Sequence, residues 1–594
     1  MKSQDQLKLG SSRWTSRRWA RIMTCVAALA LVAAACGDDG DDGGTPSGTT
    51  GTGTGTTTTL QPQSGGTLTF GAYSNIPGLD PLVALGSGTS GGIQMATVYG
   101  TLARYDTATN KYTPDMLESF TANADATEWT LKIRPGIKFT DGTDFNAEAV
   151  RFGMNRHRVG NSLPVSECAE YIACPRNTRS SAIYMALVDD IQAVDPLTVK
   201  VTLKEPWTSF PYALAGEPGM IPSPTALKKC DGTQNPNTCE FNLKPVGAGP
   251  FMISAFKVDE AIELVKNPNY WDGTVYLDGI RFVTLLDLGG ERTYDALKTG
   301  TVQGAYLRVP GAVARAKADK VPGISGIDQM GENMLMNMGV SATCAGGKPE
   351  PLCVGKPDGP TPTTPATAPL KVRQAIMAAF DPKTWNERVY QGNGLTGTEM
   401  FQESFPWNPG VPGPKYDLDR AKKLVAEAKA EGWDGTVRLL FTNSPNDANA
   451  AVALDGMLKA AGINTVVDTS KESTAQQAIV VGSKDFDLAR WGTATGPDDS
   501  ALWSMAQNLD STSGSNRVGF KSAAVDQALK DLRVAKNDAE KTAGYKVIAE
   551  EFNKQLPWIN FSAIETLKGF SPKVHGVTGS HRQFIYFDKA WMEK

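Results

Sequence analysis

Residues 129–143 read WTLKIRPGIKFTDGT. At the start of this stretch, in WTLKI, apolar and polar side chains alternate, which is typical of a strand that buries one face. Residues 198–204 (TVKVTLK) alternate in the same way. We therefore predict a half-buried β-strand at each of these places. Residues 355–368 are instead rich in Pro and Thr, a composition that predicts an exposed loop.

Amphipathic helices are predicted later in the chain. Residues 417–432 begin with Asp417, a good N-cap, and end at Gly432, which stops a helix. Residues 370–380 and 539–556 are expected to be further helices. From about residue 65 on, the chain therefore reads as a mixed α/β protein. In the helix predicted at residues 417–432, the apolar stripe consists of Ala421, Leu424, Val425 and Ala428.

Several of these segments resemble one protein family. Residues 129–143 follow, almost residue by residue, the pattern W-T-F-x-L-R-x-G-V-K-F-H-D-G-T of the extracellular solute-binding proteins of family 5, the receptors of peptide and nickel ABC importers. Further segments resemble the family's patterns in the family's order, from about residue 66 to the C-terminus. They are residues 245–251 (PVGAGPF), 266–271 (KNPNYW), 372–376 (VRQAI) and 416–424 (YDLDRAKKL).

The resemblance implies an α/β, type II periplasmic-binding-protein fold. In such a fold two lobes are joined by a hinge around a central cleft, and lobe I carries an extra subdomain. We expect residues 65–95, 236–325 and 566–594 to form one subdomain of lobe I. Residues 96–235 would form the other subdomain, and residues 326–565 would form lobe II.

The N-terminus has the composition of an export signal. Residues 1–35 carry six basic residues and one acid, and residues 22–35 form an apolar run without charge. This run is shorter than the roughly 20 residues that span a bilayer, so a cleaved signal peptide is expected. Residues 33–37 (AAACG) resemble a lipobox, which would lipidate Cys36. An ordinary secretory signal, cut before the same cysteine, is the alternative, and both the Sec and the Tat routes fit.

The segment after Cys36 favours an anchored protein. Residues 36–64 consist mostly of Gly, Asp, Thr, Ser and Pro, so we expect a flexible tether.

The chain has 59 basic and 63 acidic residues. Six of the basic residues and one of the acidic residues precede Cys36, so the part from Cys36 on has a net charge of −9. This balance argues against a nucleic-acid partner.

The cysteines suit an oxidising compartment. Beyond the signal and Cys36, six cysteines are present, and their spacing favours disulfides between sequence neighbours, although other pairings are possible. There is no C-x-x-C motif and there are three histidines, so we expect no metal site and no cofactor. The cysteines expected to pair are Cys168 with Cys174, Cys230 with Cys239, and Cys344 with Cys353.

One loop matches a catalytic pattern. Residues 88–92 (GTSGG) fit G-x-S-x-G, which would make Ser90 a nucleophile with His575 or His581 as its base. The pattern requires a strand directly before the loop, but residues 77–81 contain two prolines and a glycine. We therefore expect a binding protein, and keep a serine hydrolase as an alternative.

The same loop has two other interpretations. Residues 86–91 fit G-x-G-x-x-G, but a dinucleotide site also needs a preceding strand. The resemblance to family 5 places this loop at the entrance of the cleft. There the side chains of Ser87 and Thr89 are candidates for ligand contact.

The resemblance also selects a ligand-facing segment. Residues 485–503 align with a cleft segment that reads G-W-x-x-D-Y-x-D-P in peptide receptors, and Trp491 keeps the aromatic position. The acid that would bind a peptide's amino terminus falls at residue 494 or 495, neither of which is acidic. Asp498 and Asp499 are candidates to replace it. Capping of a helix at residues 500–505 is an equal alternative.

Three further candidates follow from the alignment alone. Asn333 lies at the start of the second lobe, and Phe401 and Trp407 follow a loop that would face the cleft. Rigid aromatic side chains often line ligand pockets. Packing in the core is the alternative for each aromatic residue.

Taken together, the sequence predicts a monomeric receptor held at the outer face of a membrane through Cys36. It would bind an oligopeptide or a related small polar solute and deliver it to the permease subunits of an ABC importer. A peptide, a nickel complex, a sugar or another solute all fit the sequence. The other hypotheses are a hydrolase that uses Ser90 and a surface sensor or scaffold that has lost transport.

Overall fold

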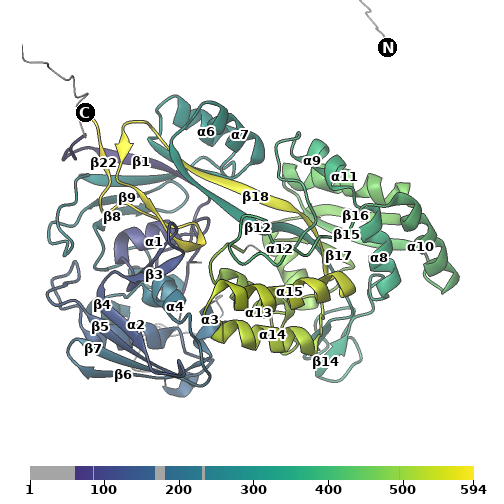
Figure 1. Ribbon diagram of the computed structural model, residues 1–594, viewed down its shortest axis with the longest axis horizontal. Coiled ribbons are helices and arrows are strands. Elements are labelled where there is room, and N and C mark those ends of the chain that lie inside the picture. Colours follow the sequence, from purple (N-terminus) through teal and green to yellow (C-terminus); the bar gives the residue numbers. More distant parts are fainter. Residues whose placement is uncertain (1–59, 85, 168–180, 231–234, 494) are drawn as a thin grey trace, which may run out of the picture. The chain divides into compact units, whose positions relative to one another are not determined.

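Ten strands form one mixed sheet in the computed structural model (Figure 1), which describes residues 60–84, 86–167, 181–230, 235–493 and 495–594. Residues 61–594 form one compact unit. In sheet order the strands are β16 (Asn464–Lys471), β15 (Thr436–Thr442), β17 (Leu488–Trp491), β12 (Gly323–Met336), β18 (Trp558–Phe570), β11 (Gly304–Leu307), β1 (Thr67–Ala72), β10 (Gly279–Thr284), β9 (Ala261–Lys266) and β8 (Phe251–Lys257).

The two longest strands, β12 and β18, pair with each other in the middle of this sheet. Their antiparallel register runs from Gly323 opposite Gly569 to Leu335 opposite Trp558. On one side β11 pairs with β18, and on the other side β17 pairs with β12. We call the part with β1 and β8–β11 the first lobe and the part with β15–β17 the second lobe. The boundaries expected near residues 325 and 565 fall inside these two strands.

The pairing of β12 with β18 is interrupted between Asp328 and Asn333, where the register shifts. Met330 has a φ of 53° there, which is the left-handed region. A β-bulge of this kind bends a strand and redirects its side chains. The bend lies where the sheet passes from the first lobe to the second.

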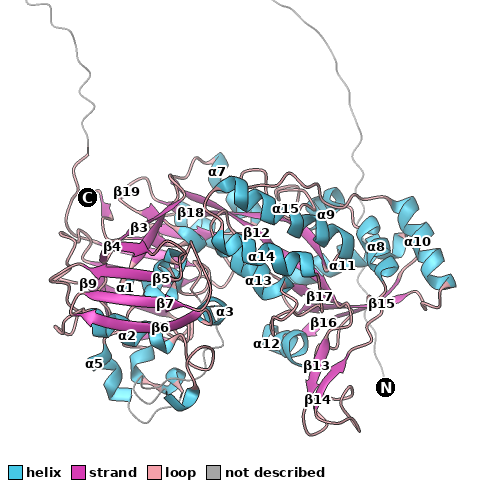
Figure 2. Ribbon diagram, turned by 60° about the horizontal axis from the view of Figure 1, so that its bottom comes forward, coloured by secondary structure: helices cyan, strands magenta, loops and turns pink. Residues whose placement is uncertain are grey.

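The first lobe also contains a separate antiparallel sheet, in the order β4 (Leu117–Ala122), β5 (Glu128–Ile133), β7 (Thr198–Leu203) and β6 (Val188–Asp195). The strands β5 and β7 confirm the two strands predicted from alternating residues. Every second side chain is buried, with Trp129 and Leu131 on β5 and Val199 and Val201 on β7. Helix α2 (Ala147–Arg156) packs on β6 and β7 (Figure 2).

Short helices complete the first lobe. Helix α1 (Gly92–Tyr99) is buried along its length, and Asn146 caps α2 by accepting a hydrogen bond from the Ala149 amide. The remaining described helices of this lobe are α3 (Ser181–Met185), α4 (Pro211–Ala215), α5 (Pro224–Leu227), α6 (Glu291–Lys298) and α7 (Pro310–Ala318).

The helices of the second lobe include the three predicted ones. Helix α10 (Leu418–Ala430) is capped by Asp417, whose carboxylate accepts a hydrogen bond from the Arg420 amide at 2.9 Å. The other two are α8 (Leu370–Ala379) and α15 (Asp538–Gln555), and α15 ends before Pro557 as expected. The second lobe also contains α9 (Pro382–Val389), α11 (Pro445–Ala460), α12 (Ser473–Gln477), α13 (Ser500–Leu509) and α14 (Ala523–Val534).

The loop predicted at residues 355–368 is partly a strand. Residues Gly359–Pro362 form β14, which pairs with β13 (Ser341–Cys344). The disulfide between Cys344 and Cys353 closes the same hairpin. The composition of residues 355–368 does not predict this strand, because its backbone partner, β13, lies outside these residues.

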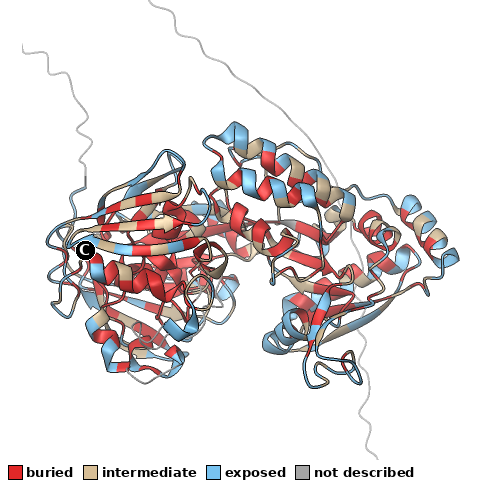
Figure 3. Ribbon diagram, turned by 90° about the horizontal axis from the view of Figure 1, so that it is seen from below, coloured by how far each residue is buried: buried red, intermediate tan, exposed pale blue. Residues whose placement is uncertain are grey.

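Apolar contact continues between the lobes. One hydrophobic cluster contains residues of the four-stranded sheet together with residues of α13, α14 and α15. Trp207 of the first lobe meets Trp503 of the second at a centroid distance of 4.8 Å and an interplanar angle of 73°. Figure 3 shows the buried residues concentrated on the inner sides of the helices and strands.

Within the described ranges, every helix is too short or too polar to span a lipid bilayer.

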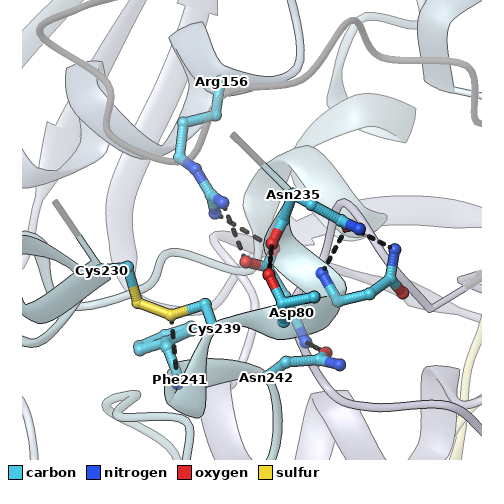
Figure 4. The surroundings of a disulfide bond; sticks show 9 residues. Asp80, Arg156, Cys230, Asn235, Cys239, Phe241 and Asn242 are labelled. Carbon is cyan, nitrogen blue, oxygen red and sulfur yellow. Dashed lines mark hydrogen bonds and ion pairs between the residues drawn. A yellow bond between two sulfur atoms is a disulfide. The ribbon is translucent and has the colours of Figure 1, made fainter. Parts of the chain in front are cut away.

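Two of the predicted disulfides are present. Cys230 pairs with Cys239 and Cys344 with Cys353, with Cα–Cα distances of 5.6 and 5.4 Å. Cys168 and Cys174 lie outside the described residues, as does Cys36. The disulfide of Cys230 lies near a buried ion pair (Figure 4).

That ion pair joins Arg156 of α2 to Asp80. The two nitrogens of the guanidinium lie 3.1 and 2.8 Å from the two carboxylate oxygens, and both side chains are 1% exposed. Asn242 Oδ1 accepts a hydrogen bond from the Asp80 amide. The pair therefore ties the segment after β1 to the four-stranded sheet's helix.

We expect Arg156→Leu to lower the free energy of unfolding by about 3–5 kcal/mol, because it leaves a buried carboxylate without its partner. Urea unfolding at neutral pH measures the change. Lys266→Met is the matched control, since Lys266 and Asp278 form an exposed pair, 45% and 54% exposed, and it should change stability by less than about 1 kcal/mol. Equal losses in the two variants would contradict this interpretation.

Candidate functional site

The loop of residues 86–92 packs against the C-terminal segment of the chain. The Gly88 amide donates to the Arg582 carbonyl at 2.9 Å, and the Gly86 amide donates to Glu217 Oε1 at 2.8 Å. A Cβ on Gly88 would lie 2.3 Å from the Gln583 carbonyl oxygen. Glycine is therefore required at this position for the loop to approach so closely.

Two predicted candidates lie on this loop. Ser87 Oγ and Thr89 Oγ1 are 3.0 Å apart and share a hydrogen bond. The Thr89 carbonyl accepts a hydrogen bond from Ser74 Oγ at 2.7 Å, which holds the loop against the segment after β1. Both side chains are half-buried. They thus lie beside the contact with the C-terminal segment.

Arg582 connects three distant parts of the chain. Its guanidinium forms an ion pair with Glu217, which is fully buried. Burial would raise the pKa of Glu217, but the charge of Arg582, together with the hydrogen bonds to the carboxylate, lowers it. The Arg582 amide donates to Asp498 Oδ2 at 3.2 Å. A residue of the first lobe thereby bonds directly to a predicted site residue of the second.

The backbone at this contact is strained. Arg582 and Gln583 have φ values of 51° and 65°, a region that non-glycine residues rarely adopt. Such conformations persist only where surrounding contacts hold them, and they concentrate at functional sites. Here the contacts are the bonds of Arg582 to Gly88, Glu217 and Asp498.

Asp498 and Asp499, considered for helix capping and for ligand contact, make different contacts in the structure. Asp498 Oδ1 accepts a hydrogen bond from the Ser500 amide at 2.7 Å, at the start of α13, while Oδ2 faces Arg582. Asp499 occupies the N-cap position but makes no side-chain cap hydrogen bond. Its carboxylate pairs instead with Lys541 Nζ at 2.9 Å. Asp498 is therefore both a partial cap and an interlobe contact.

Buried aromatic groups surround this polar cluster. The ring of His581 lies 5.5 Å from the ring of Tyr212, with the rings of Tyr105, Tyr112 and Phe584 also in contact. Burial, helped by Arg582, lowers the pKa of His581 to about 3. His581 is therefore neutral at physiological pH.

Trp491 lies at the end of β17 and is half-buried. The guanidinium of Arg517 lies over its ring at 5.1 Å from the centroid, a cation–π geometry. Residue 494, in the segment where the family's acid was sought, lies outside the described residues. Trp491 thus keeps a partly exposed ring close to Asp498 in the sequence.

Asn333 is paired with Trp491 in the register of β12 and β17 and is fully buried. Its amide nitrogen donates to Thr493 Oγ1 at 2.6 Å, and its Oδ1 has no hydrogen-bond partner among the described residues. The side chain therefore helps to fix the end of β17. A direct contact with a ligand is not needed to explain its position.

Phe401 and Trp407 belong to the core of the second lobe. Trp407 is 1% exposed, stacks on Tyr545 at 3.9 Å, and donates from Nε1 to the Pro497 carbonyl at 2.7 Å. Phe401 is 4% exposed and meets Tyr545 edge-on. These contacts fit packing in the core, the alternative considered for both rings, and contact of either ring with a ligand stays a prediction. Trp407 holds the segment before Asp498 in place through its bond to the Pro497 carbonyl.

A charged cluster at the bulge of β12 was not predicted. Arg308 follows β11 and lies near Asp328 and Glu332 of β12, while Arg490 of β17 pairs with Glu332 at 2.7 Å. Asp447 is the second carboxylate near Arg490, at 3.4 Å. No motif marks these residues. Only the strand order brings them together.

The catalytic interpretations of the loop find no support in its contacts. Ser90 Oγ is 3.3 Å from Thr89 Oγ1, whereas His575 bonds to Glu593 and His581 lies near Ser580. Neither histidine contacts Ser90 in the described part of the chain. The nearest preceding strand of the sheet, β1, ends at Ala72, so the strand required before either glycine motif is absent from the described residues there. Those residues also contain no cluster of His, Cys, Asp and Glu that could hold a metal ion.

Comparison with known proteins adds three findings. The family described as "Bacterial extracellular solute-binding proteins, family 5 Middle" matches residues 111–513. Heme-binding protein A of Haemophilus influenzae is 24% identical over 519 residues, covering 85% of this chain and 88% of that protein. Glutathione-binding protein GsiB of Shigella flexneri is 26% identical over 474 residues, covering 78% and 82%.

A solved structure shows the same fold. The oligopeptide-binding protein AppA of Bacillus subtilis, in complex with a nonapeptide, superposes with a TM-score of 0.69 at 20% identity. The match covers 90% of this chain and 100% of the AppA chain. The fold is therefore the type II periplasmic-binding-protein fold that the sequence predicted.

The burial of His581 predicts acid sensitivity. The unfolded chain protonates this histidine below its ordinary pKa of about 6.5, but the folded chain does so only near pH 3. Stability is therefore lost as the pH falls from 6.5 towards 3. His157, whose pKa burial lowers to about 4, acts in the same direction.

We expect His581→Asn to reduce the loss of stability between pH 7 and pH 5 by about 2 kcal/mol. Urea unfolding of the wild type and the variant at both pH values measures this difference. Comparing the two losses cancels the packing effect of the substitution, which acts at both pH values. An unchanged loss in the variant would contradict a neutral, buried His581.

Proposed function

Since the chain belongs to the bacterial extracellular solute-binding proteins of family 5, we propose that it is the receptor of an ABC importer and captures an oligopeptide or a related small polar solute between its lobes. The observation that carries this proposal is the meeting of three segments. The loop of residues 86–92 and Arg582 come from the first lobe, and Asp498 comes from the second. A solute held at this junction would touch both lobes.

The connection between the lobes supports such a role. Two-lobed binding proteins close around a ligand by bending at a few residues between the lobes. Strands β12 and β18 provide this connection, and the bulge between Asp328 and Asn333 interrupts their regular pairing. A solute that binds better to the closed arrangement shifts the population towards it.

Peptide chemistry is the best-supported class of solute. The relatives are named for glutathione and heme, and the superposed structure holds a nonapeptide. We propose that the partly exposed side chain of Trp491 and the hydrogen-bonding groups of Ser87, Thr89, Asp498 and Asp499 contact the solute. A few polar groups around an aromatic side chain suit a small polar solute.

We further propose that the protein works at the outer face of the membrane as a monomer. Lipid on Cys36 would anchor it, and residues 36–64 would tether it near the permease subunits. Lipoprotein anchors with more than one acyl chain hold stably to a bilayer. The receptor would then deliver its solute without altering it chemically.

Solute binding should raise thermal stability without turnover. At a solute concentration 100 times Kd, we expect about 2.7 kcal/mol of stabilisation. The purified full chain is screened by thermal unfolding against di- to pentapeptides, and any solute that co-purifies is identified by mass spectrometry. If neither experiment finds a peptide, the peptide assignment fails. If a solute is bound and also cleaved, the receptor role fails.

Trp491→Leu should weaken binding of the peptide found in that screen by about tenfold, which is about 1.4 kcal/mol, because an aromatic platform is lost. Isothermal titration calorimetry measures Kd. Trp433→Leu is the matched control, since Trp433 is also partly buried but bonds to the Thr436 carbonyl, away from the junction. Equal affinity in the wild type and Trp491→Leu would remove Trp491 from the site.

A further inference from the structure

Arg308 is surrounded by acceptors but bonded tightly to none of them. Its guanidinium nitrogens lie 3.4 Å from Asp328 Oδ2, Tyr73 Oη and the Gly331 carbonyl, and 3.7 Å from Glu332 Oε1. The side chain is 14% exposed. A guanidinium has five N–H donors, and it binds most strongly through two parallel bonds to one carboxylate.

Arg156 provides the comparison within the same chain. Its guanidinium forms two parallel bonds to Asp80 at 3.1 and 2.8 Å, and it is 1% exposed. Arg156 therefore has one close carboxylate partner that it binds through two nitrogens, while its Nε has no hydrogen-bond partner among the described residues. Arg308 has the same group but no carboxylate that it binds through two short bonds, and its contacts at 3.4 Å and 3.7 Å are long enough for a closer acceptor to replace them.

The carboxylates near Arg308 are themselves occupied. Glu332 Oε2 lies 2.7 Å from Arg490 Nη2 and also accepts a hydrogen bond from Tyr390 Oη. Asp328 Oδ1 accepts a hydrogen bond from Gln583 Nε2 at 3.2 Å. An incoming cation would find these oxygens already bonded. An incoming anion would compete only with the long contacts of Arg308, at 3.4 Å or more.

Lys568 places a second cation on the same side of the sheet. It is 2% exposed, and its Nζ donates to Gln583 Oε1. Among the described residues, no carboxylate oxygen lies within 4.0 Å of it, since it forms no salt bridge there. Burial lowers the pKa of Lys568 to about 8, so it is still charged at neutral pH. A buried charge without a partner is unfavourable.

Tyr306 adds an unused donor. It is opposite Lys568 in the register of β11 and β18, and Lys568 Nζ lies 5.6 Å from its ring centroid. The Tyr306 hydroxyl is buried and donates to no acceptor among the described residues, although the Thr566 hydroxyl lies beside it. Its ring also meets the ring of Tyr73 at 5.7 Å, and Tyr73 contacts Arg308.

These groups adjoin the proposed site. Gln583, which bonds to both Lys568 and Asp328, directly follows Arg582 in the chain. Ser74, which follows Tyr73, holds the loop of residues 86–92 through its bond to Thr89. The three donors therefore lie next to the segments that we propose to hold the solute.

We propose that Arg308, Lys568 and Tyr306 form an anion subsite, and that the solute carries a carboxylate bound there. The inference rests on the proposed function, because it describes one end of the same solute. The two cations face Asp328, with Glu332 slightly farther away, so a group with one negative charge fits better than a doubly charged one. A peptide would present its C-terminal carboxylate.

The test compares a tripeptide with its own amide. Isothermal titration calorimetry is carried out on the full chain with Ala-Ala-Ala and with its C-terminal amide, which lacks the negative charge. The wild type should bind the acid at least tenfold more tightly than the amide. Arg308→Gln should bind both equally and weakly, while Arg308→Lys should keep part of the preference.

Two further variants keep the test decisive. Tyr306→Phe removes a hydroxyl that donates to no acceptor in the described residues, so it should fold normally. It should bind the acid severalfold more weakly, with no change for the amide. Arg315→Gln is the matched control, because Arg315 is an exposed arginine of α7 that pairs with Glu291 and Asp295. It should keep the full preference for the acid.

The outcomes separate the subsite from the function. If the wild type binds the amide as well as the acid, or if Arg308→Gln keeps the preference, the subsite is wrong while the receptor role stands. If the wild type binds neither tripeptide, the same variants are tested with succinate and succinamide, and the peptide assignment is decided by the peptide screen and the co-purified solute. Succinate binding that Arg308→Gln abolishes supports the subsite, and the absence of binding by any acid overturns it.

Discussion

The pairing of β12 with β18 is the constraint on which the rest of the structure depends. These strands lie in the middle of the ten-stranded sheet and belong to both lobes. The strands of the first lobe's part of the sheet follow one another outward from β18, and those of the second lobe's part follow one another outward from β12. The register between β12 and β18 therefore sets where the side chains of each lobe lie. The bulge between Asp328 and Asn333 then turns charged side chains towards the junction.

The junction itself combines apolar contact with a small number of polar bonds. Trp207 and Trp503 bury apolar surface between the lobes, which favours their association without fixing their orientation. The bond from the Arg582 amide to Asp498 restricts it, because hydrogen bonds are directional, and the ion pair with Glu217 holds Arg582 in place within the first lobe. An arrangement of this kind suits a protein whose lobes must meet in one defined way around a solute.

The buried polar groups of the first lobe differ in how fully they are satisfied. Arg156 and Arg582 each have a close carboxylate partner, and both stabilise the fold. Arg308, Lys568 and the hydroxyl of Tyr306 lack one. In a protein interior such groups are unfavourable unless something else compensates them. Their concentration beside the proposed site is the reason for assigning them to the solute.

The sequence by itself determined the local structure and the family of this protein. Residues 129–133 and 198–204 alternate clearly enough to predict β5 and β7, and Asp417 marks the start of α10, because strand periodicity and helix capping depend on neighbouring residues alone. The motifs identified the fold, and the resemblance nominated Ser87, Thr89, Trp491 and Asp498 as site residues, which stays a prediction. The tertiary structure decided the rest. Phe401 and Trp407 lie in the core, and Arg308 meets Glu332, because burial and charge pairing depend on which strands become neighbours, and strand order is not written in any local pattern.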